Sequence, residues 1–171
     1  MIRKRRRFRV KAAVLALVGL LAAALARQQG TGAATLQGTV VSISDGDTLT
    51  LLAGRKQVRV RLFGIDCPEK GQPWGDRARH FTGGLAHGHV IRVKVRDRDR
   101  YGRTVGEAWV GGEHLNAVLV ENGLAWAYRR YSTEFVPLER AARRRKVGLW
   151  TDPHPVPPWE WRSRARTGRR A

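Results

Sequence analysis

Three acidic side chains in the first half of the chain could together bind a cation. Asp47 lies in "SDGDT", where two alternating segments meet at a tight turn. Asp66 and Glu69 lie in "RLFGIDCPEK", in which Pro68 ends a strand because proline cannot donate to a ladder. If the turn lies beside that strand end, the three carboxylates meet and repel one another unless a cation or basic side chains lie among them. Oxygen ligands favour Ca²⁺ or Mg²⁺ over zinc.

Basic side chains occur close to both acidic segments. Arg61 ends the strand that leads to Asp66, and "DRYGR" places Arg100 and Arg103 in a turn before another strand. Two arginines and a cation around one cavity suit a phosphodiester, because each guanidinium binds two phosphate oxygens and stabilises the added negative charge of the transition state. Glu69 could orient or deprotonate the attacking water.

Each of these motifs also has a simpler explanation. An Asp-Gly turn alone is usually a solvent-facing hairpin tip. Arg59 and the "RAARRRK" run at 140–146 are best explained as solvated faces of a strand and a helix. Cys67 has no histidine close in sequence to activate it as a nucleophile, and a single cysteine excludes a disulfide within the chain and a cysteine-based zinc site.

The pattern of apolar residues predicts the elements that must position these groups. Alternation predicts five short strands and helical spacing predicts three helices, one of them inserted after the third strand. We expect a β-barrel with helices (α+β), specifically a five-stranded OB-fold barrel with three α-helices, an architecture that often binds oligonucleotides. The predicted strands are 38–44, 48–52, 57–64, 89–96 and 104–109, and the predicted helices are 74–85, 113–122 and 133–147, the last preceded by a Ser-Thr cap.

Three blocks in this order resemble the signature motifs of the thermonuclease family, which has a staphylococcal-nuclease-like (SNase-like) domain. The resemblance covers about residues 38–150 and rests on "DGDT" at 45–48, "RLFGIDCPE" at 61–69 and "DRYGR" at 99–103. It implies a Ca²⁺-dependent endonuclease that hydrolyses phosphodiester bonds of DNA and RNA and leaves 3′-phosphate ends.

The resemblance also implies roles for individual residues. Asp47 and Asp66 match calcium-binding carboxylates, Cys67 matches a residue that ligates through its backbone carbonyl, and Asp45 matches an acidic residue near the metal. Glu69 matches the residue usually assigned as general base. The remaining matches are Arg61 and Arg103 as the phosphate-binding pair, and Arg100 and Tyr101 as contacts to the terminal phosphate of a bound nucleotide. Tyr128 and Tyr131 are open candidates for base stacking.

The charge and the termini indicate where the chain acts. It has 33 Lys and Arg against 14 Asp and Glu, a net charge of +19, which favours polyanionic partners. A basic start precedes the apolar run 12–26, whose length as a helix is about 22 Å, shorter than a hydrocarbon core of about 30 Å. We therefore expect a signal peptide or an N-terminal membrane anchor at 1–26, and an exported protein that is secreted, periplasmic or membrane-anchored, with contact to anionic lipid through this segment.

The remaining chain divides by composition. We expect a linker at 27–36, the nuclease domain at 37–151, and a Pro-rich strap followed by a basic disordered tail at 152–171. The expected oligomeric state is a monomer. The alternative function is a non-catalytic nucleic-acid-binding OB module of the same family, against which stands the presence of all five residues expected to act in hydrolysis.

Overall fold

The computed structural model describes residues 34–167. The predicted signal peptide or anchor, most of the linker and residues 168–171 lie outside this range. The strands are β1 (Thr35–Asp45), β2 (Thr48–Ala53), β3 (Lys56–Leu62), β4 (Ile65–Asp66), β5 (Val90–Arg98), β6 (Thr104–Val110), β7 (Glu113–His114) and β8 (Trp126–Ala127). The helices are α2 (Gly75–Ala86), α3 (Leu115–Glu121), α4 (Val136–Arg145), the 3₁₀ helix η1 (Gly148–Thr151) and α5 (Pro158–Thr167).

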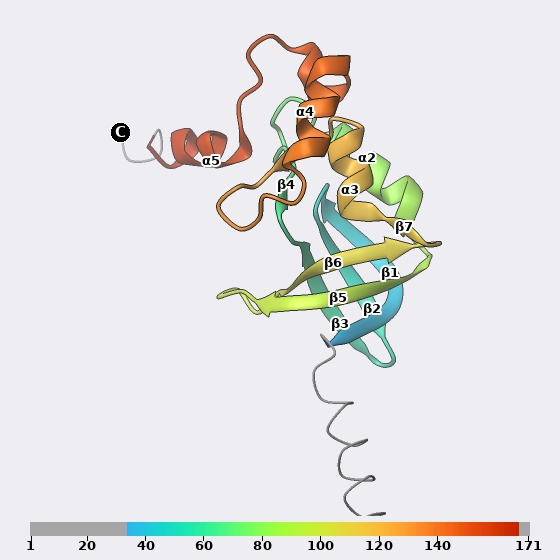
Figure 1. The fold of residues 1–171 in the computed structure, drawn as a ribbon. Coiled ribbons are helices and arrows are strands. Elements are labelled where there is room, and N and C mark those ends of the chain that lie inside the picture. The colour runs from blue at the N-terminus through green and yellow to red at the C-terminus, as the bar shows by residue number, and fades with distance from the viewer. Residues whose placement is uncertain (1–33, 168–171) are drawn as a thin grey trace, which may run out of the picture. The chain divides into compact units, whose positions relative to one another are not determined.

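Five of the strands close into a barrel (Figure 1). Neighbours pair in the order β3-β2-β1-β5-β6, and a parallel pairing of β3 with β6 joins the two edges. Val60 lies opposite Thr104 and Leu62 opposite Gly106 at this closing seam. The seam consists of three residue pairs, and its closure confirms the predicted five-stranded OB-type barrel.

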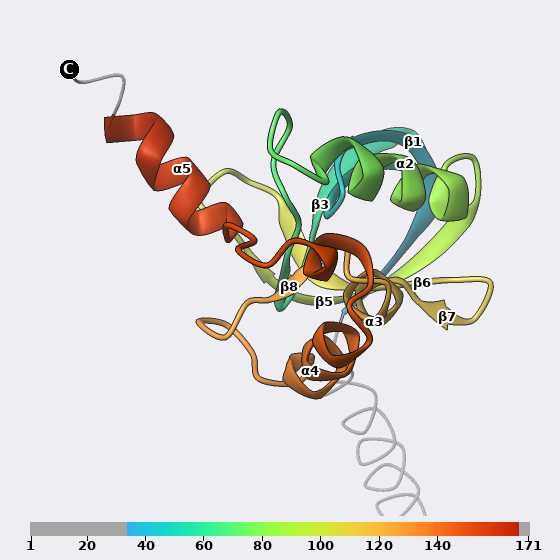
Figure 2. The same cartoon turned by 90° about the horizontal axis from the view of Figure 1, so that it is seen from above.

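The barrel is filled by the inward-facing half of each alternating strand. The pairs Leu49 and Leu51 on β2 and Val60 and Leu62 on β3 are all buried, and α3 adds Leu119 above them. The side chains between them on the strands point outward, as period-two alternation requires. Helix α2 packs against β1, and Figure 2 shows these two elements next to each other.

The turn between β1 and β2 is covered by protein. A Cβ on Gly46 would lie 2.8 Å from both the side chain of Cys67 and that of Ala78, so only glycine allows this close approach. The carbonyl of Gly46 accepts a 2.7 Å hydrogen bond from the Thr82 hydroxyl of α2. The hairpin tip that carries Asp47 is therefore buried, and the solvent-turn explanation is wrong for it.

Two predicted helices begin later than expected. Residues Glu113 and His114 pair with β6 before α3 starts. Helix α4 begins at Val136 rather than at residue 133, and no side chain caps its first turn. The Ser132 hydroxyl instead accepts a local hydrogen bond of 3.1 Å from the Glu134 N–H, which satisfies the turn ahead of the helix.

The described residues contain four α-helices where three were predicted. The additional helix, α5, lies in the segment that we expected to be strap and disordered tail. Its first residue is Pro158, a position that proline tolerates because the first-turn N–H has no partner within the helix. Pro158 thus begins a helix in a segment that we expected to have none. Figures 1 and 2 show α5 extending away from α2, α3 and α4.

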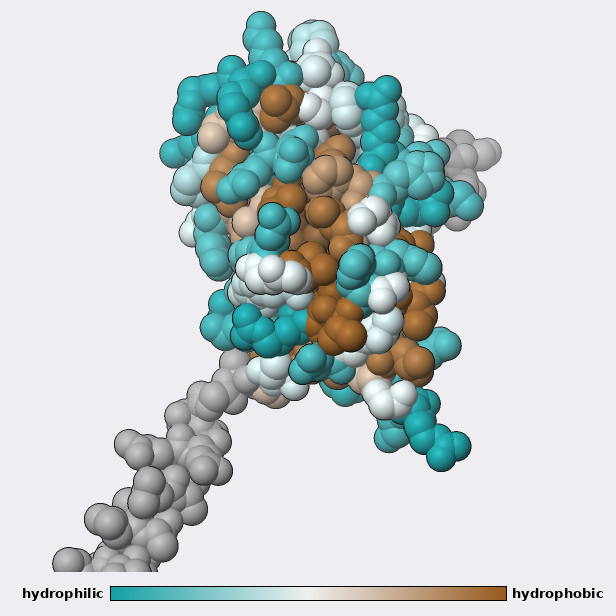
Figure 3. All heavy atoms as spheres, turned by 90° about the vertical axis from the view of Figure 1, so that its right-hand side faces the viewer, coloured by the Kyte–Doolittle hydropathy of each residue, from teal (hydrophilic) through white to brown (hydrophobic). Residues whose placement is uncertain are grey.

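On the face of the described part that Figure 3 shows, a band of hydrophobic side chains lies among polar ones. The exposed large hydrophobic residues of the described part are Val41, Leu52, Val90, Tyr101 and Tyr131. None of the helices in residues 34–167 combines the length and the apolar character needed to cross a membrane.

A buried glutamate of α4 holds β8 to that helix. Glu139 is 0% exposed, and its carboxylate accepts 2.8 Å hydrogen bonds from the Ala127 N–H and from Arg143.

We expect Glu139→Ala to lower the free energy of unfolding by about 1–3 kcal/mol, because the buried Ala127 N–H loses its acceptor. Urea denaturation followed by tryptophan fluorescence measures this. Glu134→Ala, an exposed glutamate nearby, is the matched control, and an equal loss in both variants would contradict the assignment.

Candidate active site

The Asp47 carboxylate is buried and takes hydrogen bonds from neighbouring segments. Only 4% of the residue is exposed. Its Oδ2 accepts a 2.6 Å bond from the Cys67 N–H, and its Oδ1 a 3.3 Å bond from the Thr48 hydroxyl. The Asp47 N–H donates in turn to Asp45 Oδ1 at 3.2 Å. The hairpin tip is thereby tied to the segment that follows β4.

Arg61 joins two of the predicted acidic residues. Its Nη1 lies 2.7 Å from Asp47 Oδ2, and its Nη2 lies 2.7 Å from Asp66 Oδ1. The antiparallel register opposes Arg61 to Thr48, which places the guanidinium beside Asp47. Gly64, with φ +71°, then turns the chain so that β4 brings Asp66 back to the same guanidinium. The two carboxylates therefore lie within the span of one arginine side chain.

Burial and charge act in opposite directions on these groups. Burial raises the pKa of Asp47 well above its usual value, and the nearby charges of Asp45 and Asp66 raise it further, while Arg61 lowers it. Burial lowers the pKa of Arg61, but Asp47 and Asp66 outweigh this effect and the net pKa is raised. Asp47 thus requires positive charge nearby to stay ionised.

The thiol of Cys67 takes no part in this chemistry. Burial raises its pKa well above the usual value, and the neighbouring Asp47 adds to the increase. The thiol stays neutral, which agrees with the conclusion that it is not a nucleophile.

A second arginine, which the sequence did not identify, binds the other side of Asp66. Arg162 of α5 places Nη2 2.8 Å from Asp66 Oδ2 and Nη1 3.2 Å from Asp66 Oδ1, and it also pairs with Glu69. Burial lowers the pKa of Arg162, but the bonds to Asp66 and Glu69 raise it by more. Arg162 thereby links Glu69 to the cluster of Asp47, Arg61 and Asp66.

Arg103 joins the same cluster through Thr48. Its Nη1 lies 3.4 Å from the Thr48 hydroxyl, which itself bonds to Asp47. Its Nε donates to Asp99 Oδ2 at 2.7 Å, and Asp99 Oδ1 accepts from the Tyr101 and Arg103 N–H groups at 2.9 and 3.0 Å. Burial raises the pKa of Asp99, but its bonds to Arg103 and Tyr101 lower it by more. The turn is thus built to hold Arg103.

Arg100 and Tyr101 lie at the rim of the site. Tyr101 is 67% exposed, and the guanidinium of Arg100 lies 5.0 Å from the centre of its ring. Arg103 approaches the same ring at 5.6 Å. The loop between β5 and β6 therefore presents one aromatic face and two guanidinium groups next to the acidic cluster.

The aromatic residues after β8 form a stack with α5. Tyr128 lies parallel to Trp159, with ring centres 5.3 Å apart and an interplanar angle of 2°. Tyr131 meets Tyr128 edge-on at 5.0 Å and is exposed. One face of Tyr128 is thus covered by the C-terminal helix.

The carboxylate oxygens of Asp47 and Asp66 are of the kind that a hard cation prefers as ligands, but here they bind arginine side chains. Within residues 34–167, no group of three or more His, Cys, Asp or Glu side chains is arranged to hold a metal ion as it stands. Both oxygens of Asp66 pair with guanidinium groups, and one oxygen of Asp47 does so as well. Carboxylates held this close and this deeply buried fit a divalent cation in composition and charge.

Comparison with known proteins identifies the family of the chain. A family described as "Staphylococcal nuclease homologue" matches residues 59–152. The chain is 43% identical to "Protein ParB" of Escherichia coli over 172 residues, covering 93% of this chain and 94% of that protein. It is 39% identical to "Micrococcal nuclease" of Shigella flexneri over 166 residues, covering 90% and 95%. An "Uncharacterized endonuclease" of Escherichia coli O157:H7 is 42% identical over 134 residues, covering 77% and 88%. The chain therefore belongs to the staphylococcal nuclease family and is an SNase-like nuclease.

Proposed function

We propose that this nuclease is a calcium-dependent endonuclease that cleaves DNA and RNA and leaves 3′-phosphate ends. The observation that carries the proposal is the Arg61 guanidinium, which lies 2.7 Å from both Asp47 and Asp66. Buried carboxylates and arginines that meet in one place, next to an accessible acid, provide the groups needed to bind and attack a phosphodiester.

Asp47 and Asp66, with the backbone carbonyl of Cys67, would hold the calcium ion. The bound ion would supply positive charge to a phosphate oxygen and make a coordinated water easier to deprotonate. Asp45 supports this arrangement, because its carboxylate fixes the backbone N–H of Asp47.

Arg61 and Arg103 would bind the scissile phosphate from two sides. A guanidinium offers parallel N–H donors to two phosphate oxygens, and such contacts are most valuable where negative charge increases in the transition state. Arg61 is free for this task once the charges of Asp47 and Asp66 are otherwise compensated. Arg100 and Tyr101 at the exposed rim would contact the next phosphate or sugar.

Glu69 would act on the water. Its side chain is 35% exposed, unlike that of Asp66, which is 1% exposed. An accessible carboxylate beside the cluster can orient a water molecule and accept its proton. The Glu69 N–H donates to Gln72 Oε1 at 3.0 Å, which fixes the backbone at this position.

We further propose that the protein is exported and acts as a monomer, with residues 1–26 as a signal peptide or as an anchor on anionic membranes. The basic residues followed by an apolar run in this segment support export.

The alternative function, a nucleic-acid-binding module without activity, predicts that the protein binds nucleic acid and does not cleave it.

Calcium should be required for cleavage. Single-stranded DNA and RNA should be degraded by the purified protein with CaCl₂ and should remain intact with EGTA, because the acidic cluster needs a cation to accept a phosphate. A polymerase should extend the DNA fragments only after a 3′-phosphatase has removed their terminal phosphate. Substrate that shifts in a gel with calcium but is never cleaved would instead support the binding module.

Arg61 should contribute more to catalysis than Arg59, which lies on the same strand. We expect Arg61→Lys to lower kcat about 10²–10³-fold, because an ammonium group cannot supply two parallel donors to the phosphate. The control is Arg59→Lys, which makes the same change on the exposed part of β3 and should keep near-normal activity. Equal activities of the two variants in a nuclease assay would exclude the proposed role of Arg61.

Glu69 should contribute through proton transfer. We expect Glu69→Gln to lower kcat about 10²–10⁴-fold while substrate binding changes little, because the amide keeps the shape but cannot accept the proton. Single-turnover kinetics separates the two effects. A variant that loses binding but retains the chemical rate would contradict the assignment.

A further inference from the structure

The C-terminal strap, residues 152–167, covers the candidate active site at two positions. Arg162 binds both oxygens of Asp66 and pairs with Glu69, and Trp159 stacks on Tyr128. Both contacts come from one helix, α5, and both are made to groups that the proposed reaction would use or that lie next to it.

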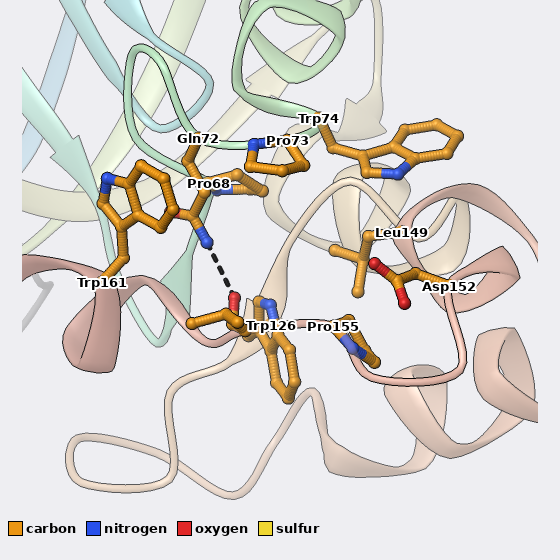
Figure 4. A pocket seen from close by; sticks show the side chains of 10 residues that line it. Pro68, Gln72, Pro73, Trp74, Trp126, Leu149, Asp152, Pro155 and Trp161 are labelled. Carbon is orange, nitrogen blue, oxygen red and sulfur yellow. Dashed lines mark hydrogen bonds between the residues drawn. The ribbon is translucent and has the colours of Figure 1, made fainter.

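Besides the contacts of Arg162, α5 is held by Trp159, whose ring also meets Trp126 edge-on at 5.6 Å. Pro158 is the only buried residue of the helix. Before the helix, the carbonyl of Val156 accepts a 2.7 Å hydrogen bond from the Gln72 side chain (Figure 4). Trp161 lines a pocket with Pro68 and Trp126, so the packing between the strap and the body leaves open space (Figure 4). The placement of the helix therefore depends mainly on Arg162 and Trp159.

Arg162 occupies the oxygens that a cation would need. The guanidinium bonds to Asp66 Oδ1 and Oδ2 at 3.2 and 2.8 Å, and Arg61 already uses Oδ1. A divalent cation and Arg162 carry charge of the same sign, so both cannot bind the same carboxylate closely without strong repulsion. Binding of one must weaken binding of the other.

We propose that Arg162 and α5 form a latch that closes the site in the metal-free protein and is released when a divalent cation binds Asp66. The latch rests on the proposed function, since it takes Asp66 as a cation ligand. Arg162 acts as a substitute counter-ion that keeps Asp66 and Glu69 charge-balanced without metal. Its release also removes Trp159 from Tyr128, which exposes an aromatic face on which a base of the substrate can stack.

The chain offers a matched control for this idea. Arg166 lies on the same helix one turn further along and is exposed, so Arg166→Ala removes the same charge without touching the acidic cluster. Hydrogen exchange and calorimetry on the full chain, with CaCl₂ as the only ligand, then separate a latch from a general charge effect. Exchange in β1, β2 and β3 reports whether each variant is folded.

The latch predicts two results. In the unmodified protein, saturating Ca²⁺ should speed exchange of the α5 amides, whereas Arg162→Ala should show fast exchange there without Ca²⁺. Arg162→Ala should also bind Ca²⁺ about tenfold more tightly than the unmodified protein and Arg166→Ala, because cation binding no longer breaks a charge-assisted pair.

Two other outcomes would overturn the latch for different reasons. If Ca²⁺ binds but α5 stays as protected as before and the three affinities are equal, the calcium site stands and the latch is wrong. If calorimetry detects Ca²⁺ binding to neither the unmodified protein nor Arg162→Ala, the calcium site itself fails and the latch fails with it.

Discussion

The site depends on a single guanidinium between two carboxylates that are shielded from water. Asp47 and Asp66 are almost completely buried, and an ionised carboxylate in such a position is unstable without a bound positive group. Arg61 supplies that charge to both at 2.7 Å. Its position follows from the β2–β3 register, and the bend at Gly64 brings the second carboxylate to it. The barrel thus determines where Asp47 and Asp66 meet, because its strand register fixes the position of Arg61.

Much of this arrangement follows from local sequence rules. Alternation predicted the strands because each faces the core on one side, and the three motifs predicted that Asp47, Arg61 and Asp66 meet. Helix α4 begins later than its sequence pattern predicts, because the Ser132 hydroxyl accepts a hydrogen bond within the preceding turn. The hairpin tip is buried because it packs against Cys67 and α2. The spacing of residues along the chain does not predict this packing.

The role of Arg162 could not be found in this way. It is one of many arginines, it is 96 residues from Asp66, and a proline-rich segment precedes it. Many of the other arginines also bind the chain's own acids: Arg103 binds Asp99, and Arg143 binds Glu139. The positive charge of this protein is therefore partly internal, and an excess of basic residues says little about which of them face a partner.

The isolated cysteine has a practical consequence. Cys67 is 3% exposed, and its sulfur packs so closely on the hairpin that only a glycine fits beside it. Alkylating reagents and oxidants have no access to it while the barrel is closed, and two molecules cannot be cross-linked through it. The folded enzyme should therefore be indifferent to thiol oxidants, and its stability rests on packing and hydrogen bonds without any disulfide.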